Sequence, residues 1–143
     1  NPQVNKLLIK HFIELRAASP EGSAHVLDID GLKDPSIKFW SLWKNDLLTG
    51  CGALKFLNDE HGEFKSIRVH DTFRKKGYGI EIINHLILEA KKLKVKQLSI
   101  ETGAGIFFIP ARKLFKNCGF EPCEPFAHYK KDINSIYLTK FIS

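Results

Sequence analysis

The sequence predicts a single α+β domain built on a mixed, mostly antiparallel sheet. Its 143 residues lie within the usual size of one domain, so residues 1–143 are treated as one unit. Residues 37–69 contain three strand-like segments joined by short polar turns, which is typical of an antiparallel meander. A long helical segment and another strand follow, and a strand–helix–strand unit places its two strands parallel.

The first half of the chain predicts one helix and three strands. Val4–Ala18 is a helix because apolar residues recur at steps of three and four, and we expect Asp28 to cap a short helical turn through Leu32. The strands are Ile37–Trp43, Leu47–Leu57 and Glu63–Val69.

Two details of these strands are predicted as well. Gly50 and Gly52 lie inside the second strand and indicate a bulge or a close backbone approach. Strict alternation in the third strand would place Phe64 and Arg68 on the face opposite the following residues: Lys65, Ile67 and Val69.

The second half predicts two helices and three strands. Gly79–Leu93 carries one apolar stripe and is a helix, and Pro110 occupies the first turn of another that ends before Gly119. The strands are Lys96–Glu101, a short one from Phe120, and Ser135–Phe141.

The hydropathy, cysteine content and charge of the chain disfavour several classes of protein function. No apolar run approaches the roughly 20 residues of a membrane helix, and there is no secretory signal, so we expect a cytoplasmic protein without a membrane partner. Cys51, Cys118 and Cys123 fit neither a disulfide framework nor a zinc pattern, which favours reduced thiols and no metal. The net charge of +6 suggests an anionic ligand or a solubilising surface. Without a nucleic-acid motif, nucleic-acid binding ranks last.

The stretch from Val69 to Ile80 predicts an anion site. A strand ends, three basic residues follow (Arg74, Lys75 and Lys76), and Gly77 and Gly79 open a long helix. Backbone N–H groups freed by the glycines, the helix dipole and the basic charges together suit a pyrophosphate. Taken alone, the pattern is also that of a tight turn with solvated lysines, and it matches neither the P-loop nor the dinucleotide fingerprint.

Two motifs that follow one another along the chain together resemble those of a known protein family. Arg74-x-x-Gly77-x-Gly79 resembles the acetyl-CoA pyrophosphate loop of the GNAT superfamily of N-acetyltransferases. Ala111-Arg112-Lys113-Leu114-Phe115 with Cys118-Gly119-Phe120 resembles that family's AxxLYxxxGF signature. The resemblance runs from about Trp40 to Phe141, and Glu101-Thr102-Gly103, Pro125-Phe126 and Asn134-Ser135 look like a bacterial branch of small acetyltransferases.

The resemblance implies a three-layer fold in which the parallel strands splay apart to hold acetyl-CoA. Backbone groups at the end of the third strand would bind the pantetheine arm, and the basic loop would bind the pyrophosphate. The cofactor-binding residues expected in this way are Ile67, Arg68, Val69, Arg74, Lys75, Lys76, Gly77, Tyr78, Gly79, Ile80, Thr102, Arg112 and Phe115.

The resemblance also implies catalytic roles. The free N–H of Val69 would bind the thioester oxygen, and Glu63 would take the proton of the attacking amine, with His70 and Glu101 in reserve; Glu63 could equally be an exposed strand-start residue. The family's proton-donating tyrosine falls at Phe115, and its asparagine is absent near Phe108. Tyr129 or Cys118 could donate instead, although a rim tyrosine and a buried thiol are the simpler interpretations.

The leading hypothesis is therefore acetyl transfer from acetyl-CoA to a primary amine, expected to be a small molecule, by direct attack in a ternary complex. The alternative is a catalytically silent acetyl-CoA sensor, which Phe115 favours. Phe126, His128 and Tyr129 would form an aromatic rim at the acceptor. The family fold starts with a strand before its first helix, and we expect that strand to be absent from this chain or left out of it. Ile37–Trp43 would then be an exposed edge, open to a homodimer or an exchanged segment.

Overall fold

The computed structural model describes residues 2–18, 34–73 and 77–142, and it confirms the predicted order of elements. The predicted ends of each long element lie within about two residues of those found. The predicted cap at Asp28 lies outside the described residues. The elements are α1 (Pro2–Ala18), β1 (Ile37–Lys44), β2 (Leu47–Phe56), β3 (His61–Val69), η2 (Asp71–Phe73), α2 (Tyr78–Lys92), β4 (Gln97–Gly103), η3 (Ile106–Phe108), α3 (Ile109–Asn117), β5 (Glu121–Pro122) and β6 (Ser135–Phe141).

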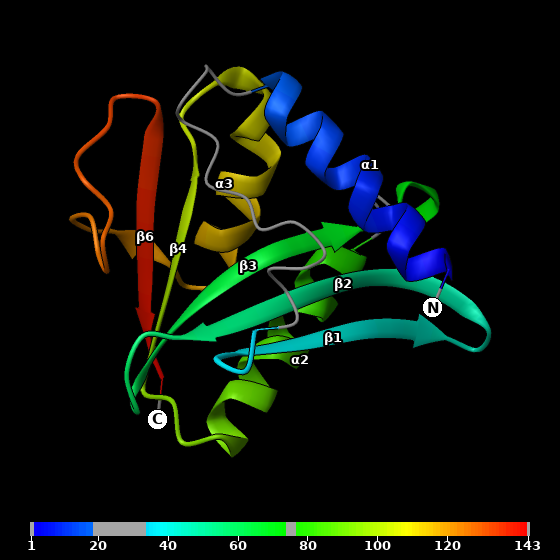
Figure 1. The fold of residues 1–143 in the computed structure, drawn as a ribbon, viewed down its shortest axis with the longest axis horizontal. Coiled ribbons are helices and arrows are strands. Elements are labelled where there is room, and N and C mark those ends of the chain that lie inside the picture. Colours follow the sequence, from blue (N-terminus) through cyan, green and yellow to red (C-terminus); the bar gives the residue numbers. More distant parts are fainter. Residues whose placement is uncertain (1, 19–33, 74–76, 143) are drawn as a thin grey trace.

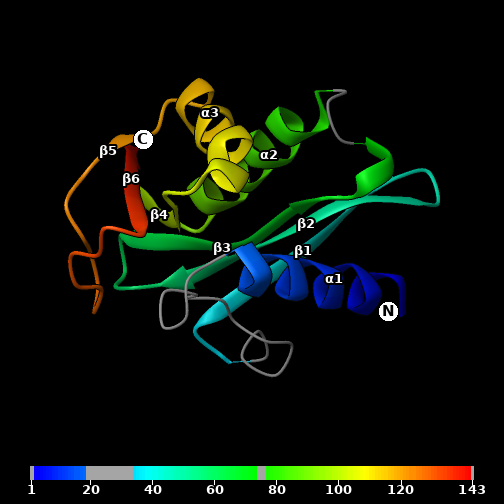
Figure 2. The same ribbon diagram turned by 90° about the horizontal axis from the view of Figure 1, so that it is seen from above.

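The strands form one six-stranded sheet in the order β1-β2-β3-β4-β6-β5 (Figure 1). Every neighbouring pair is antiparallel except β3 and β4, which are parallel because α2 crosses between them. Figure 2 shows α1 on one face of the sheet and α2 with α3 on the other, which gives the three layers that were expected.

Two apolar clusters hold the layers together. The larger one joins α2 and α3 to the sheet, with Leu54, Phe64 and Leu98 almost fully buried. The smaller one joins α1 to β2, where Leu7 and Leu8 pack with Leu48 and Ala53 as well as Val4 and Cys51.

The two glycines of β2 confirm the predicted close approach. A Cβ atom on Gly50 would lie 2.5 Å from the Ile82 side chain, and one on Gly52 would lie 2.5 Å from Leu86. Glycine is therefore what lets α2 lie directly on this strand.

A bulge in β3 overturns the prediction that Phe64 and Arg68 share a face. The pairing of β2 with β3 shifts after Cys51, and Ser66 has φ 54°. Beyond this extra residue Ile67 and Val69 pack in the same cluster as Phe64, whereas Arg68 reaches Glu14 of α1. An inserted residue exchanges the two faces of a strand, and sequence alternation alone does not reveal it.

Within the described residues α1 precedes all strands and β1 forms one edge of the sheet, as expected. No helix in the described part of the chain is both long enough and apolar enough to span a membrane.

Candidate acetyl-CoA and acceptor site

The parallel strands β3 and β4 separate soon after they meet. They pair at three positions only, which join His61 to Gln97, Gly62 to Leu98 and Glu63 to Ser99. β3 then continues to Val69 paired with β2, and β4 continues to Gly103 paired with β6. The two strands therefore diverge toward their carboxyl ends, as Figure 1 shows. We refer to the space between these diverging ends as the wedge.

The backbone of Val69 faces the wedge. The His70 N–H donates to the Thr49 carbonyl at 2.7 Å, so this antiparallel pair is hydrogen-bonded. Hydrogen-bonded and non-bonded pairs alternate along an antiparallel ladder. The adjacent pair, Val69 with Gly50, is therefore non-bonded, and its Val69 amide points away from β2 toward β4.

The start of α2 supplies the second part of the site. Gly77 is the N-cap residue with φ 84°, a left-handed conformation that favours glycine. A Cβ on Gly79 would lie 2.8 Å from Leu114, so α3 packs closely on the first turn of α2. The Tyr78 hydroxyl accepts a hydrogen bond from Lys44 Nζ at 2.9 Å, and Ile80 is exposed. The predicted phosphate-binding residues Arg74, Lys75 and Lys76 lie outside the described residues.

Two further predicted cofactor residues, Thr102 and Arg112, lie at or beside the end of β4, whereas Phe115 lies near the C-terminal end of α3. Thr102 is buried in that strand. Arg112 of α3 donates through one nitrogen to the carbonyls of Gly103 and Gly105, both at 2.9 Å, and so holds the loop that follows β4. Phe115 is only 3% exposed and packs edge-on against Phe120.

The side chain of Arg68 binds residues of α1 and η2, whereas the cofactor-binding role expected of Arg68 concerns its backbone. Its guanidinium is buried and donates to Glu14 of α1 at 2.6 Å and to Asp71 of η2 at 3.0 Å. Lys10 of α1 also bonds Asp71. The side chain thus ties α1 to the turn that leads into the basic loop, and only the backbone of Arg68 lies along the wedge.

Glu63 is a buried carboxylate, contrary to the alternative that it is an exposed strand-start residue. It is 1% exposed and lies on the face of β3 opposite Phe64. Its Oε2 accepts a hydrogen bond from the Tyr129 hydroxyl at 2.6 Å and lies 3.3 Å from Lys65 Nζ. Lys65 Nζ also donates to the Tyr129 hydroxyl at 3.0 Å. The structure therefore brings together the two predicted catalytic side chains, Glu63 and Tyr129, and adds Lys65, which the sequence analysis missed.

A chain of polar side chains continues beside this group. His61 Nε2 lies 2.8 Å from Ser99 Oγ, which in turn lies 2.9 Å from Thr139 Oγ1. Burial lowers the pKa of His61, although the nearby Glu63 partly offsets this effect. Glu101 accepts a hydrogen bond from Ser135 at 2.7 Å.

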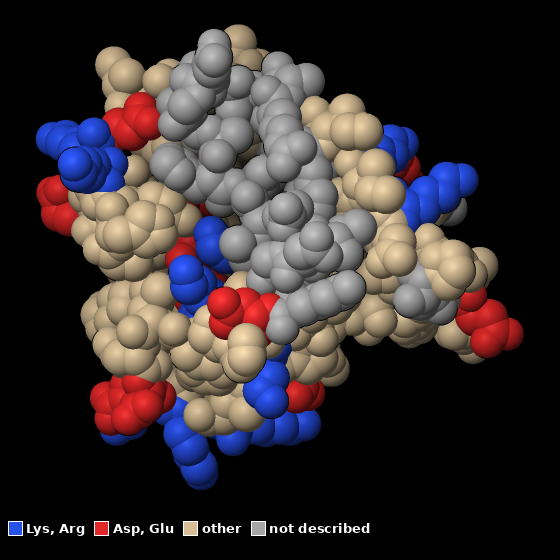
Figure 3. Space-filling view, viewed as in Figure 1, with Lys and Arg blue, Asp and Glu red and all other residues tan. Residues whose placement is uncertain are grey.

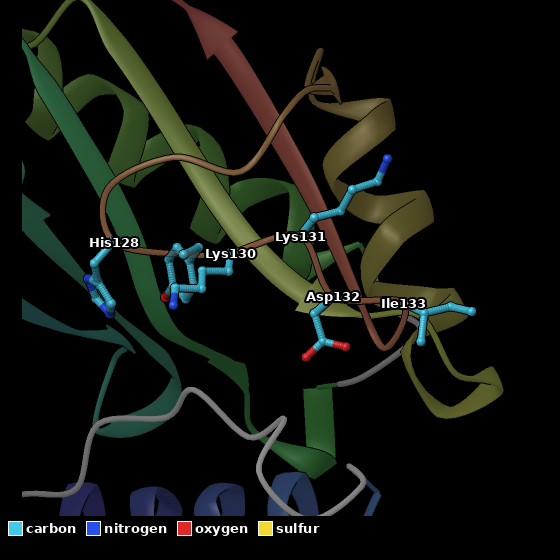
Figure 4. A pocket seen from close by; sticks show the side chains of 6 residues that line it. His128, Lys130, Lys131, Asp132 and Ile133 are labelled. Carbon is cyan, nitrogen blue, oxygen red and sulfur yellow. The ribbon is translucent and has the colours of Figure 1, made fainter.

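The loop between β5 and β6 closes over this face with aromatic side chains. Phe126, Tyr129 and Tyr137 pack against one another, and His128 stacks on Tyr129, which confirms that the predicted rim residues lie together. Residues 128–133 line a recess of about 460 Å³. Figure 4 shows His128 and Asp132 pointing to the same side of this loop, while Lys131 points to the other.

The pKa of Tyr129 is raised, first by burial and then by the neighbouring Glu63 carboxylate. Such a phenol holds its proton strongly, so it acts as a hydrogen-bond donor to Glu63 and is a poor acid toward a departing thiolate. Burial likewise raises the pKa of the Cys118 thiol.

Charges of both signs are interspersed over the face that carries α1 (Figure 3).

Comparison with known proteins identifies the class to which this fold and this wedge belong. The model of the acetyltransferase (GNAT) family matches residues 3–120, and the chain belongs to that family. It is an N-acetyltransferase that uses acetyl-CoA as cosubstrate, which confirms the type of reaction and the cosubstrate of the leading hypothesis.

Three similar proteins are named as acetyltransferases. The chain is 45% identical over 138 residues to the uncharacterized N-acetyltransferase YsnE of Bacillus subtilis, covering 96% of this chain and 91% of that one. It is 37% identical to the uncharacterized N-acetyltransferase YedL of Escherichia coli, covering 97% and 87%. It is 29% identical to the IAA acetyltransferase of Azospirillum brasilense, covering 85% and 78%.

Solved structures agree on the fold. A putative acyl-CoA N-acyltransferase from Klebsiella pneumoniae superposes with a TM-score of 0.75 at 23% identity, covering 93% of this chain and 88% of that one. A GNAT family acetyltransferase from Elizabethkingia anophelis with acetyl-CoA bound superposes with a TM-score of 0.63 at 25% identity, covering 75% and 77%.

Proposed function

We propose that the enzyme transfers the acetyl group of acetyl-CoA directly to a primary amine of a small molecule, with both substrates bound at once. The observation that carries this proposal is the wedge, where β3 and β4 part after three paired residues and the Val69 amide faces the opening. A thioester lying there would receive the amine from the α1 side of the sheet, where Glu63 lies.

Val69 is the proposed partner of the thioester oxygen. Its N–H is directed away from β2 by the hydrogen-bond alternation of the ladder. A fixed backbone donor aimed at the developing oxyanion stabilises the tetrahedral intermediate without reorganisation. When the intermediate collapses, the C–S bond breaks and CoA leaves as a thiolate; a thiol pKa of about 8.5 makes this departure feasible without the tyrosine that Phe115 replaces.

Glu63 is the proposed general base. A primary amine is protonated at neutral pH and must lose a proton before it can attack. Glu63 Oε2 is engaged by Tyr129, but Oε1 is buried without a hydrogen-bond partner among the described residues. That oxygen is suited to receive the proton, directly or through one water.

The acceptor is proposed to bind beside the loop that contains Tyr129. The recess of about 460 Å³ along residues 128–133 is of a size that suits a small molecule.

The test is turnover of a panel of primary amines, followed by thiol release, in wild type and in Glu63→Gln. We expect the variant to lose about 10²- to 10⁴-fold in kcat, the usual contribution of a general base, while its affinity for acetyl-CoA stays unchanged. Glu60→Gln is the matched control because Glu60 is exposed and lies on the neighbouring turn. Full turnover in Glu63→Gln would exclude Glu63 as the base.

If the amine attacks acetyl-CoA directly, no covalent acetyl-enzyme should form. Incubation with acetyl-CoA alone should leave the intact mass of the protein unchanged. An acetylated protein that passes its acetyl group on to the amine would instead show a two-step transfer.

A further inference from the structure

Glu63, Lys65 and Tyr129 form a closed triangle of polar contacts in the interior. Tyr129 Oη lies 2.6 Å from Glu63 Oε2, Lys65 Nζ lies 3.0 Å from Tyr129 Oη, and Lys65 Nζ lies 3.3 Å from Glu63 Oε2. The side chains of Lys65 and Glu63 are only 10% and 2% exposed. Lys65 and Glu63 are two residues apart on one strand and so share a face, whereas Tyr129 comes from the β5–β6 loop.

Burial by itself would work against a base at this position. Removing a carboxylate from water disfavours its charged form, and a neutral carboxylic acid cannot accept the proton of an ammonium ion. An ammonium group and a hydroxyl donor within contact distance favour the charged form again. Both of these donors approach the same oxygen, Oε2, and leave Oε1 aside.

We propose that Lys65 and Tyr129 are positioning residues that keep the buried Glu63 carboxylate ionised and leave Oε1 as the oxygen that receives the proton. This inference rests on the proposed role of Glu63 as general base. It assigns a function to Lys65 and changes the function of Tyr129 from a proton donor for the thiolate to a partner of the base.

The other ionisable groups around Glu63 do not take over this task. Burial lowers the pKa of His61 from β3, which disfavours its charged form. Glu101 from β4 carries the same sign as Glu63 and accepts its own hydrogen bond from Ser135. From β6 and the loop, Tyr137 donates to the Lys130 carbonyl, and His128 stacks on the ring of Tyr129. Among the described residues, Lys65 is the cation in contact with Glu63.

The experiment measures the protonation of Glu63 without requiring the acceptor. The protein is labelled with ¹³C at glutamate side-chain carboxyls, and the Glu63 resonance is assigned by its loss in Glu63→Gln. Its chemical shift is then followed against pH in wild type, Lys65→Met, Lys65→Arg and Tyr129→Phe. Lys92→Met is the control, because Lys92 also lies 3.3 Å from a glutamate, Glu89, but on an exposed helix surface.

We expect Glu63 to take up its proton at a pH about 1 to 3 units higher in Lys65→Met than in wild type, as is usual when an adjacent opposite charge is lost. Lys65→Arg should restore most of the shift, Tyr129→Phe should produce a smaller shift in the same direction, and Lys92→Met should produce none. The acid limb of the pH profile of kcat/KM should move by the same amount as the resonance.

Two results would overturn the inference, and they differ from a failure of the proposed function. If Glu63 titrates at the same pH in wild type and Lys65→Met, Lys65 does not keep it ionised. If Lys65→Arg behaves like Lys65→Met, charge is not the reason for any shift. If the Glu63 resonance moves as expected but Glu63→Gln retains full turnover, Lys65 does keep Glu63 ionised, but Glu63 is not the general base.

Discussion

Glu63 and Arg68 lie five residues apart on β3, and each places an ionisable side chain in the interior. Glu63 contacts Tyr129 and Lys65, and Arg68 joins α1 to the turn at Asp71. Buried ionisable groups need polar partners, and both side chains have them. The bulge at Ser66 allows Arg68 to return to this face of the strand while Ile67 and Val69 pack toward α2.

The partly buried His61 should make the free energy of unfolding depend on pH. Burial lowers its pKa in the folded protein below the usual value of 6.5, so the unfolded chain takes up the proton first. The free energy of unfolding should therefore fall as the pH falls below about 6.5, and this contribution should be absent in His61→Gln. Urea unfolding of wild type and His61→Gln at several pH values tests this, and the same dependence on pH in both proteins would contradict it.

Part of the site could be predicted from single residues, and part could not. Two motifs with fixed spacing correctly indicated the family, and the proposed phosphate loop and the proposed roles of Val69 and Glu63 depend on that resemblance. The contact between Glu63 and Tyr129 joins positions 66 residues apart and depends on how the last loop folds back. Lys65 was open to prediction, because a residue two positions from Glu63 shares its face of the strand.

At the element scale, the helices and strands followed the sequence closely because their signals are local. The apolar stripe of α2, the glycines before it and Pro110 at the start of α3 mark boundaries through short-range physics. The ladder between β2 and β3 is irregular at Gly52, where a bulge or a close approach was expected, but the extra residue lies in β3, which depends on the pairing of the two strands. The tie from Arg112 to the loop after β4 likewise comes from tertiary packing.

The left-handed Gly77 at the start of α2 should be needed for tight binding of acetyl-CoA. Gly77→Ala should weaken acetyl-CoA binding, because a left-handed φ of 84° costs a residue with a Cβ about 1–2 kcal/mol and relaxation would turn the amides away from the phosphates. That cost corresponds to about a 5- to 30-fold loss of affinity in calorimetry. Gly105→Ala is the control, because Gly105 has φ −69° and a Cβ there would meet nothing within 4 Å. Equal affinity in both variants would contradict this role for Gly77.

At the scale of the whole molecule, β1 leaves one edge of the sheet open in the described part of the chain. Ser36 O accepts from Phe56 N–H, so alternation points the amide of Ser41 outward from β2. Exposed edges recruit partners, and we propose that a second copy pairs here.

Sedimentation equilibrium should then show a concentration-dependent dimer that is lost in Ser41→Pro, which removes an outward N–H without breaking a bond to β2. A monomer at every concentration in the wild type would contradict the dimer.

The proposed mechanism requires acetyl-CoA to lie in the wedge, and an amide NMR titration of the labelled protein with acetyl-CoA tests this most directly. We predict saturable shifts of the Val69 amide and of the amides from Gly77 to Ile80, with little change along β1. No shifts at high micromolar acetyl-CoA, or shifts along β1 that spare Val69 and Gly77, would contradict the wedge as the site of acetyl transfer.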